Sequence, residues 1–302
     1  MKSAALVLLL FFACLLPAQT PANPNDPAEL VKQGRKLQGE GKLDEALALY
    51  RKALDAAPNN YSAHFSSGSA LDLKGDYAAA RKEFDQAIAA ANPEQKPSAF
   101  RSMAISYAFE GKAAEAAKYE RQAYDLELAK PDYIAAAEVA NEQARLYIEA
   151  GDLDNAHKWY KMGYDTALKK SDLKENERAL WDFRWEHAQA RIAARRGKHD
   201  EAMRHVSAAK AALDKANNPD QQRFYPYLTG YVAFYNKDYK TAISDLSQVN
   251  PPDPFIQVLL AQAYEKSGDS AQAQELYRKA LTSNAHNPTN AFARRIARGK
   301  VQ

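Results

Sequence analysis

The side chains best suited to acid–base or metal chemistry gather in one short stretch, at His199, Asp200, Glu201 and His205. A zinc site of the helical protease type needs two histidines four residues apart, and no pair among the six histidines has that spacing. His199 stands two residues after a glycine, a place that tyrosine takes elsewhere in the chain. We therefore interpret the cluster as part of a turn between helices.

Motifs for other kinds of catalysis are also missing from the sequence. The glycines do not form a phosphate-binding loop, and Ser66-Ser67-Gly68-Ser69 lacks the strand–turn–helix setting of a serine nucleophile. Glu138 and Glu142 are spaced to share one face of a helix, and without a pocket we interpret them as a solvated face. The sequence therefore predicts a protein that is not an enzyme and has no metal and no cofactor.

The composition predicts helices throughout the 302 residues. Alanine, the strongest helix former, is abundant, whereas the sequence has only 12 glycines and 14 prolines. A single cysteine excludes a disulfide-stapled fold. Lysine and arginine (41) nearly balance aspartate and glutamate (38), and the net charge of +3 is too small to predict nucleic-acid binding.

The first 18 residues are typical of a signal peptide. Lys2 gives a basic start, and the apolar run from Ala4 to Leu16 is too short to span a bilayer as a helix. Cleavage after Ala18 would leave residues 19–27 as a proline-rich linker. We therefore expect an exported bacterial protein, periplasmic or secreted. In an alternative interpretation, Cys14 is the lipidated residue of a lipoprotein signal.

A six-residue pattern that begins with glycine and ends with alanine recurs along the rest of the chain. Successive copies begin 34, 36, 40, 46, 40 and 31 residues apart, in the range of helix-pair repeats. The glycine–alanine pairs are Gly41 and Ala46, Gly75 and Ala80, Gly111 and Ala116, Gly151 and Ala156, Gly197 and Ala202, and Gly268 and Ala273. The sixth copy has Lys237 in place of the glycine.

Each copy is typical of a tight turn between two antiparallel helices. Glycine adopts the left-handed backbone conformation that ends a helix at little cost. The alanine five residues later is expected where the two helices cross, because a larger side chain there would separate them.

This pattern resembles the tetratricopeptide repeat, a helix–turn–helix unit of 34 residues. The resemblance covers residues 28–289 and implies an elongated all-α solenoid of about seven helix–turn–helix repeats, in which each hairpin buries its faces against its neighbours. Residues 290–302 are then expected to form a C-terminal capping helix and basic tail, with Phe292 and Ile296 packed inward and the arginines outward.

In tetratricopeptide proteins the first helix of each pair lines a concave face where partner peptides commonly bind. The resemblance places on this face, among others, Arg101, Arg145, Arg191, Tyr227 and Tyr231. The ladder of arginines would suit an acidic segment or a free C-terminus, because guanidinium groups pair with carboxylates. Alternatively, glutamates within the same helices neutralise the ladder. Exposed tyrosines would act as rigid anchors for a partner.

The resemblance therefore implies a non-catalytic scaffold that holds a protein or peptide segment, acidic under the first alternative, in its concave groove. It implies no membrane span. The alternative function is a lipid-anchored assembly factor of the cell envelope, which requires Cys14 to be the first residue of the mature protein.

Overall fold

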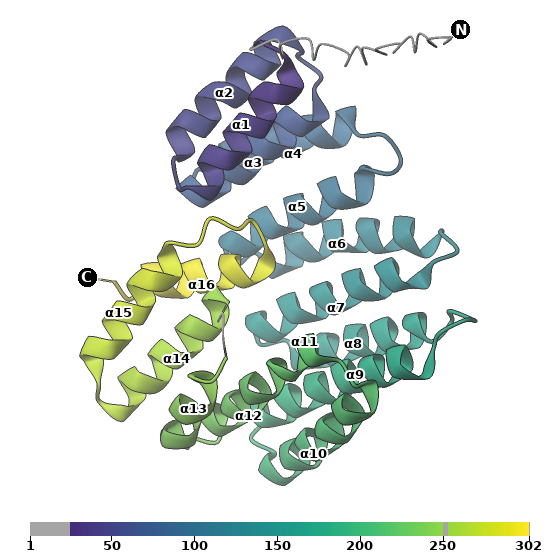
Figure 1. The fold of residues 1–302 in the computed structure, drawn as a ribbon, viewed down its shortest axis with the longest axis vertical. Helices are drawn as coiled ribbons and strands as arrows, with labels where there is room; N and C mark the ends of the chain where they lie inside the picture. Colours follow the sequence, from purple (N-terminus) through teal and green to yellow (C-terminus); the bar gives the residue numbers. More distant parts are fainter. Residues whose placement is uncertain (1–24, 250–252, 302) are drawn as a thin grey trace, which may run out of the picture.

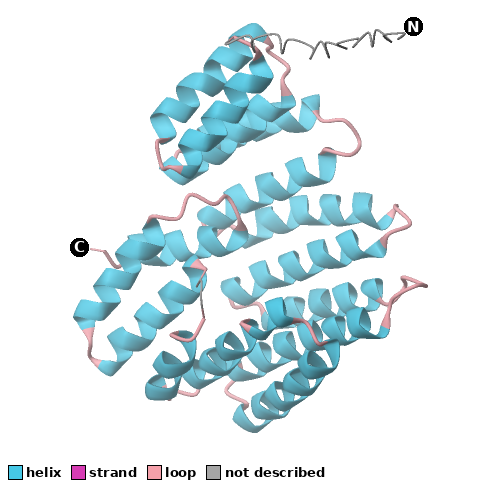
Figure 2. Ribbon diagram, viewed as in Figure 1, coloured by secondary structure: helices cyan, strands magenta, loops and turns pink. Residues whose placement is uncertain are grey.

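A computed structural model describes residues 25–249 and 253–301 of the chain. The predicted signal peptide, Cys14 and most of the predicted linker lie outside these residues. The described chain is helical, with no strand, and it forms seven helical hairpins that stack side by side (Figures 1 and 2). The prediction of an all-α solenoid is therefore confirmed.

The hairpins run in chain order through the molecule (Figure 1). They are α1/α2 (Pro27–Gly39, Leu43–Ala56), α3/α4 (Tyr61–Lys74, Tyr77–Ala90), α5/α6 (Lys96–Phe109, Ala113–Leu128), α7/α8 (Tyr133–Ala150, Leu153–Ala167), α9/α10 (Glu175–Arg195, His199–Ala216), α12/α13 (Phe224–Tyr235, Tyr239–Leu246) and α14/α15 (Pro254–Ser267, Ser270–Leu281). A short helix, α11 (Pro219–Gln222), precedes the sixth hairpin, and α16 (Pro288–Arg298) follows the seventh.

The turns inside the hairpins have the backbone that the repeated pattern requires. All six turn glycines have a positive φ, from 71° at Gly197 to 96° at Gly75. Lys237 takes the same left-handed conformation with a φ of 65°, although a side chain makes that conformation costly. The alanine of every copy is buried, with an exposed fraction between 0% and 2%.

The close approach of the paired helices depends on small residues opposite large rings. A Cβ atom added at Gly34 would lie 2.4 Å from the ring of Tyr50, and one added at Gly68 would lie 2.7 Å from the ring of Phe84. Tyr50 and Phe84 have no exposed surface. Each ring therefore fills the space that the missing side chain leaves.

The C-terminal end does not extend the stack, which corrects the expectation of an elongated solenoid. Helix α16 packs on α14, α15 and α5, so that the last part of the chain returns to the first half (Figure 1). Asn284 Nδ2 donates to the carbonyl oxygen of Gly39 at 3.3 Å, and His286 Nε2 lies 2.8 Å from Asp72 Oδ2. These contacts join residues more than 200 positions apart and close the superhelix on itself.

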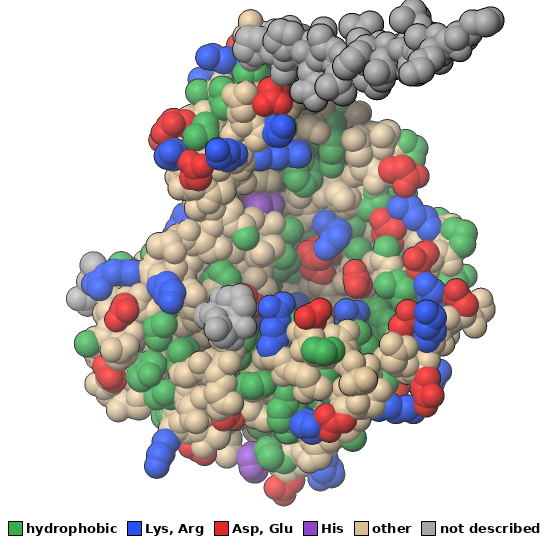
Figure 3. Space-filling model, in the orientation of Figure 1, with side chains coloured by type: hydrophobic (Ala, Val, Ile, Leu, Met, Phe, Trp, Pro, Cys, Tyr) green, Lys and Arg blue, Asp and Glu red, His purple; other side chains and the backbone are tan. Residues whose placement is uncertain are grey.

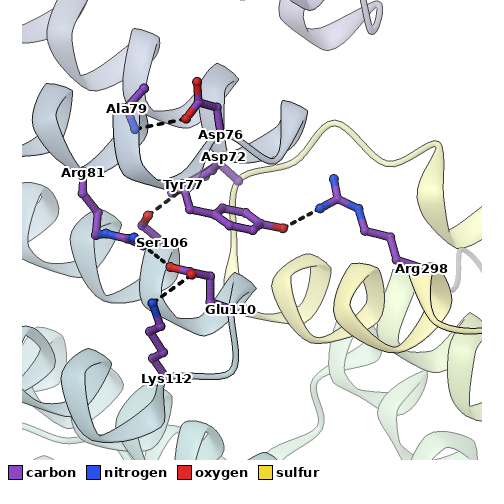
Figure 4. A network of polar contacts seen from close by, with 10 residues as sticks. Asp72, Asp76, Tyr77, Ala79, Arg81, Ser106, Glu110, Lys112 and Arg298 are labelled. Carbon is purple, nitrogen blue, oxygen red and sulfur yellow. Dashed lines mark hydrogen bonds and ion pairs between the residues drawn. The ribbon is translucent and has the colours of Figure 1, made fainter.

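Polar contacts hold α16 against the second hairpin and join the second hairpin to the third (Figure 4). The guanidinium of Arg298 donates to the hydroxyl of Tyr77 at the start of α4. Nearby, Asp72 accepts a hydrogen bond of 2.8 Å from Ser106 on α5. Asp72 is fully buried, and this burial raises the pKa of its carboxyl group, an effect that the bonds from His286 and Ser106 oppose.

The orientation of α16 corrects a second expectation. Phe292 is buried and Ile296 is partly buried, as the amphipathic pattern predicts, and Arg295 and Arg298 are exposed. Arg294, however, is only 7% exposed. It points inward because its guanidinium bonds the carbonyl oxygens of Leu73 and Ser283. Along the described part of the chain, no helix has the length and apolar character that crossing a bilayer requires.

Candidate functional site

A cavity of about 360 Å³ opens on the inner side of the superhelix, where the first helices of the central hairpins converge. Its walls come mainly from α7, α9 and α12, with single residues of α8 and α11 and the beginnings of α14 and α16. Lys, Arg, Asp and Glu side chains gather in the hollow at the middle of the face shown in Figure 3. The fold thus places charged side chains from distant parts of the sequence around one space.

Two arginines of this cavity have no counter-ion among the described residues. Arg145 on α7 and Arg191 on α9 both line the cavity, and neither has a carboxylate oxygen within ion-pair distance in that part of the chain. Arg145 has buried Nε and Nη2 atoms, and Arg191 has buried Nε and Nη1 atoms, without a hydrogen-bond partner. Arg191 is 4% exposed and bonds only the hydroxyl of Tyr160, at 2.8 Å. A buried cation without a partner is costly, so this site favours an anion.

Arg101, the third member of the predicted ladder, is placed differently. Its Nε donates to Glu142 Oε2 at 3.0 Å, and it does not line the cavity. Glu142 belongs to α7, so this ion pair joins two helices. The other oxygen of Glu142, Oε1, is buried without a partner.

Two further arginines near the predicted ladder also pair between helices. Arg184 lies 3.6 Å from Glu138, and Arg195 lies 2.9 Å from Glu149. These pairs differ from the expected neutralisation within the same helices, because each one joins two helices. Glutamates neutralise Arg101, Arg184 and Arg195 across helices, while Arg145 and Arg191 are left without a carboxylate partner in the described chain.

The two predicted tyrosine anchors are not exposed, which corrects their expected role. Tyr231 has no exposed surface, and its hydroxyl accepts a bond of 2.7 Å from Arg195. Tyr227 is 3% exposed, and it lines the cavity with a buried hydroxyl that has no partner. Both rings belong to the central core, in one cluster with Phe255 and Ile256 of α14 and Phe292 of α16. Tyr227 can contact a ligand inside the cavity, whereas Tyr231 supports the neighbouring arginines.

His187 adds a neutral polar group to the cavity. Burial lowers the pKa of its imidazole well below the ordinary value, and the positive charges of Arg191 and Arg145 lower it further. Its Nε2 atom is buried without a partner. The imidazole therefore stays uncharged at neutral pH and can exchange a hydrogen bond with a ligand.

The apolar walls of the cavity were not predicted from the sequence. They include Phe183, Phe224, Ile256 and Pro288, which come from four different helices or helix ends. None of these residues belongs to the repeated pattern, and the positions that they occupy depend on how α14 and α16 fold back. No signal in the sequence identifies them.

The histidine–carboxylate cluster lies on the outer side of a turn. His199 begins α10 and is exposed, and His205 Nδ1 lies 2.6 Å from Glu186 Oε2 instead of facing His199. Throughout residues 25–249 and 253–301, no three side chains of the metal-binding types come close enough to hold an ion.

Comparisons with known proteins place the repeats in one family. Three tetratricopeptide repeat models match, over residues 31–96, 186–208 and 256–287. The comparison with curated proteins finds no match.

Solved structures share the fold at low sequence identity. A tetratricopeptide repeat protein from Parabacteroides merdae is 15% identical with a TM-score of 0.55, and the match covers 89% of this chain and 98% of that one. A putative kinesin light chain with nearly identical TPR-like repeats from Podosopora anserina is 17% identical with a TM-score of 0.52, over 65% of this chain and 99% of that one. The matched segments lie at both ends and in the middle of the stack, so the chain contains tetratricopeptide repeats.

Proposed function

We propose that the protein is a non-catalytic scaffold that binds an acidic segment of a partner protein at the cavity on its concave side. The tetratricopeptide fold supports the binding of a partner protein. The choice of an acidic segment rests on one observation: Arg145 and Arg191 line the same cavity, and each has buried N–H groups without a partner. A carboxylate on the partner would satisfy these donors and offset both charges.

The carboxylates that line the cavity do not already fill this role. Glu142 pairs with Arg101 and Glu138 with Arg184. Asp253 accepts the capping bond of 2.9 Å from the amide of Ile256 at the start of α14, and its charge acts on Arg145 only from a distance. Two of the three lining carboxylates are thus paired with other arginines, which leaves the guanidinium groups of Arg145 and Arg191 for an acidic side chain from outside.

The proposal includes export, as residues 1–18 suggest. Cleavage after Ala18 is favoured over lipidation of Cys14, because two phenylalanines precede Ala13 where a lipoprotein signal usually has leucine and a small residue. The intact mass of the protein from its native host tests this part. A mass that corresponds to a chain beginning at Gln19 supports it, and a mass that corresponds to an acylated chain beginning at Cys14 contradicts it.

A random peptide library tests the binding proposal. Peptides selected on the wild-type protein should be enriched in Asp and Glu, and Arg145→Gln should reduce their binding by at least about tenfold. Arg51→Gln removes the same charge from an exposed position on α2 and serves as the control. Selected peptides without acidic enrichment, or equal binding to the wild type and Arg145→Gln, would contradict the proposal.

A further inference from the structure

The cavity offers more hydrogen-bond donors than the protein itself uses. Besides the free atoms of Arg145 and Arg191, the hydroxyl of Tyr227 and Nε2 of His187 are buried without a partner. All four residues line the cavity. Buried polar groups are normally satisfied, so a concentration of unsatisfied groups around one space indicates a ligand.

Aromatic rings hold both guanidinium groups and leave most of their N–H groups free, since only Nη2 of Arg191 donates, to the hydroxyl of Tyr160. Arg145 stacks over the ring of Phe255 at 4.7 Å, and Arg191 lies 5.6 Å from the ring of Tyr160 and 5.8 Å from that of Tyr231. A ring face attracts the positive charge, but it leaves the edge of the guanidinium free. The free Nε and Nη2 of Arg145 lie on one edge of its guanidinium and can bind an oxyanion with two parallel bonds, while Arg191 offers its free Nε and Nη1 singly.

Part of the remaining lining is apolar, beside polar side chains and the carboxylates of Glu138, Glu142 and Asp253. Phe183, Phe224, Ile256 and Pro288 contribute hydrocarbon surface next to the cationic groups. The volume of about 360 Å³ lies within the range of small-molecule sites, about 300–1,000 Å³. A short hydrophilic anion would leave the apolar part of this space empty, and a neutral hydrocarbon would leave the arginines unpaired.

We infer that the cavity binds a small organic acid, whose oxyanion lies between Arg145 and Arg191 and whose hydrocarbon body contacts the apolar walls. The inference goes beyond the proposed function, because the ligand is a free molecule and not a protein segment. It depends on the same cavity, so the test uses the protein alone with small probes and no peptide.

Isothermal titration calorimetry with three probes tests the inference. Phenylacetate carries both the oxyanion and the apolar body, phenylacetamide lacks the charge, and acetate lacks the body. We expect phenylacetate to bind one site saturably, and the other two probes to bind at least about tenfold more weakly. If phenylacetate shows no saturable binding at millimolar concentration, or binds no better than phenylacetamide, the inference is wrong. If acidic peptides still bind in that case, the proposed function stands without it.

Two variants assign the binding to the cavity. Arg145→Gln should weaken phenylacetate binding by at least about tenfold, while Arg51→Gln on the exposed face of α2 should not change it. Tyr227→Phe should weaken binding without reducing the thermal midpoint, because the hydroxyl has no partner in the protein. Unchanged affinity in both cavity variants would overturn the inference, even if the wild type binds the acid.

Discussion

Replacing Arg294 by alanine should release the helix that closes the superhelix. Arg294 Nη1 donates to the carbonyl oxygen of Leu73 at 3.0 Å, and Nη2 donates to that of Ser283 at 2.8 Å. Leu73 lies in the last turn of α3, where carbonyl groups have no partner within the helix. The side chain therefore satisfies groups that the fold would otherwise bury without hydrogen bonds.

The size of the expected loss in stability follows from these two hydrogen bonds and from the cost of burying the guanidinium group. A hydrogen bond from a charged donor contributes about 1.5–3 kcal/mol, and an acceptor left buried without a partner costs about 1–3 kcal/mol. Burial of the guanidinium opposes this gain, since it lowers the pKa of Arg294, as does the charge of Arg298. We expect Arg294→Ala to lower the free energy of unfolding by about 2–4 kcal/mol.

Urea denaturation followed by circular dichroism measures the loss. Arg295→Ala is the matched control, because Arg295 is the next residue on the same helix and is exposed. Its effect should stay within about 0.5 kcal/mol. Since Pro288 and Thr289 of α16 line the cavity, Arg294→Ala should also weaken ligand binding. Equal stability of the two variants would refute the role of Arg294 in closing the superhelix.

Three further substitutions probe the packing and the buried charges, each by urea denaturation. Gly68→Ala should cost about 1–3 kcal/mol, because its Cβ would lie 2.7 Å from the buried ring of Phe84, whereas Gly39→Ala, with open space around it, should cost nothing; equal effects would contradict this. Lys237→Gly should raise stability by about 0.5–1 kcal/mol by relieving a positive φ, and an unchanged or lower urea midpoint would count against it. Burial, and then the charge of Glu142, raise the pKa of Glu120 well above its ordinary value, so the folded protein keeps a proton there that the unfolded chain loses. The free energy of unfolding must then fall as the pH rises above the ordinary pKa of glutamate. Glu120→Gln should therefore be more stable than the wild type at about pH 8 but not at about pH 4. A difference in stability between the two proteins that does not change with pH would refute the raised pKa of Glu120.

The repeated fold was predictable because its signals are local. Each glycine and the alanine five residues later act within a single turn, and Lys237 shows that the position of the turn is kept even where the glycine is lost. The closure was not predictable, since the inward position of Arg294 depends on a carbonyl group 221 residues away. The amphipathic pattern of α16 alone places the arginines together on the outer side.

The candidate site was predictable in part for the same reason. The resemblance to tetratricopeptide repeats places Arg145 and Arg191 on the inner face, and the structure places both on the cavity. Spacing does not determine which arginine meets a glutamate on the next helix, as Arg101 meets Glu142. Nor does it show that Tyr231 is buried, because its hydroxyl meets Arg195 on a helix 36 residues away in the sequence.

The central claim is that an anionic group enters the cavity and meets Arg145 and Arg191. Nuclear magnetic resonance of the arginine Nε–Hε groups, during titration with an acidic peptide from the library, tests it most directly. The account predicts that the signals of Arg145 and Arg191 shift until the site is saturated, while that of Arg101, already bonded to Glu142, stays in place. Shifts at Arg101 alone, or a saturated complex in which Arg145 and Arg191 do not shift, would contradict it.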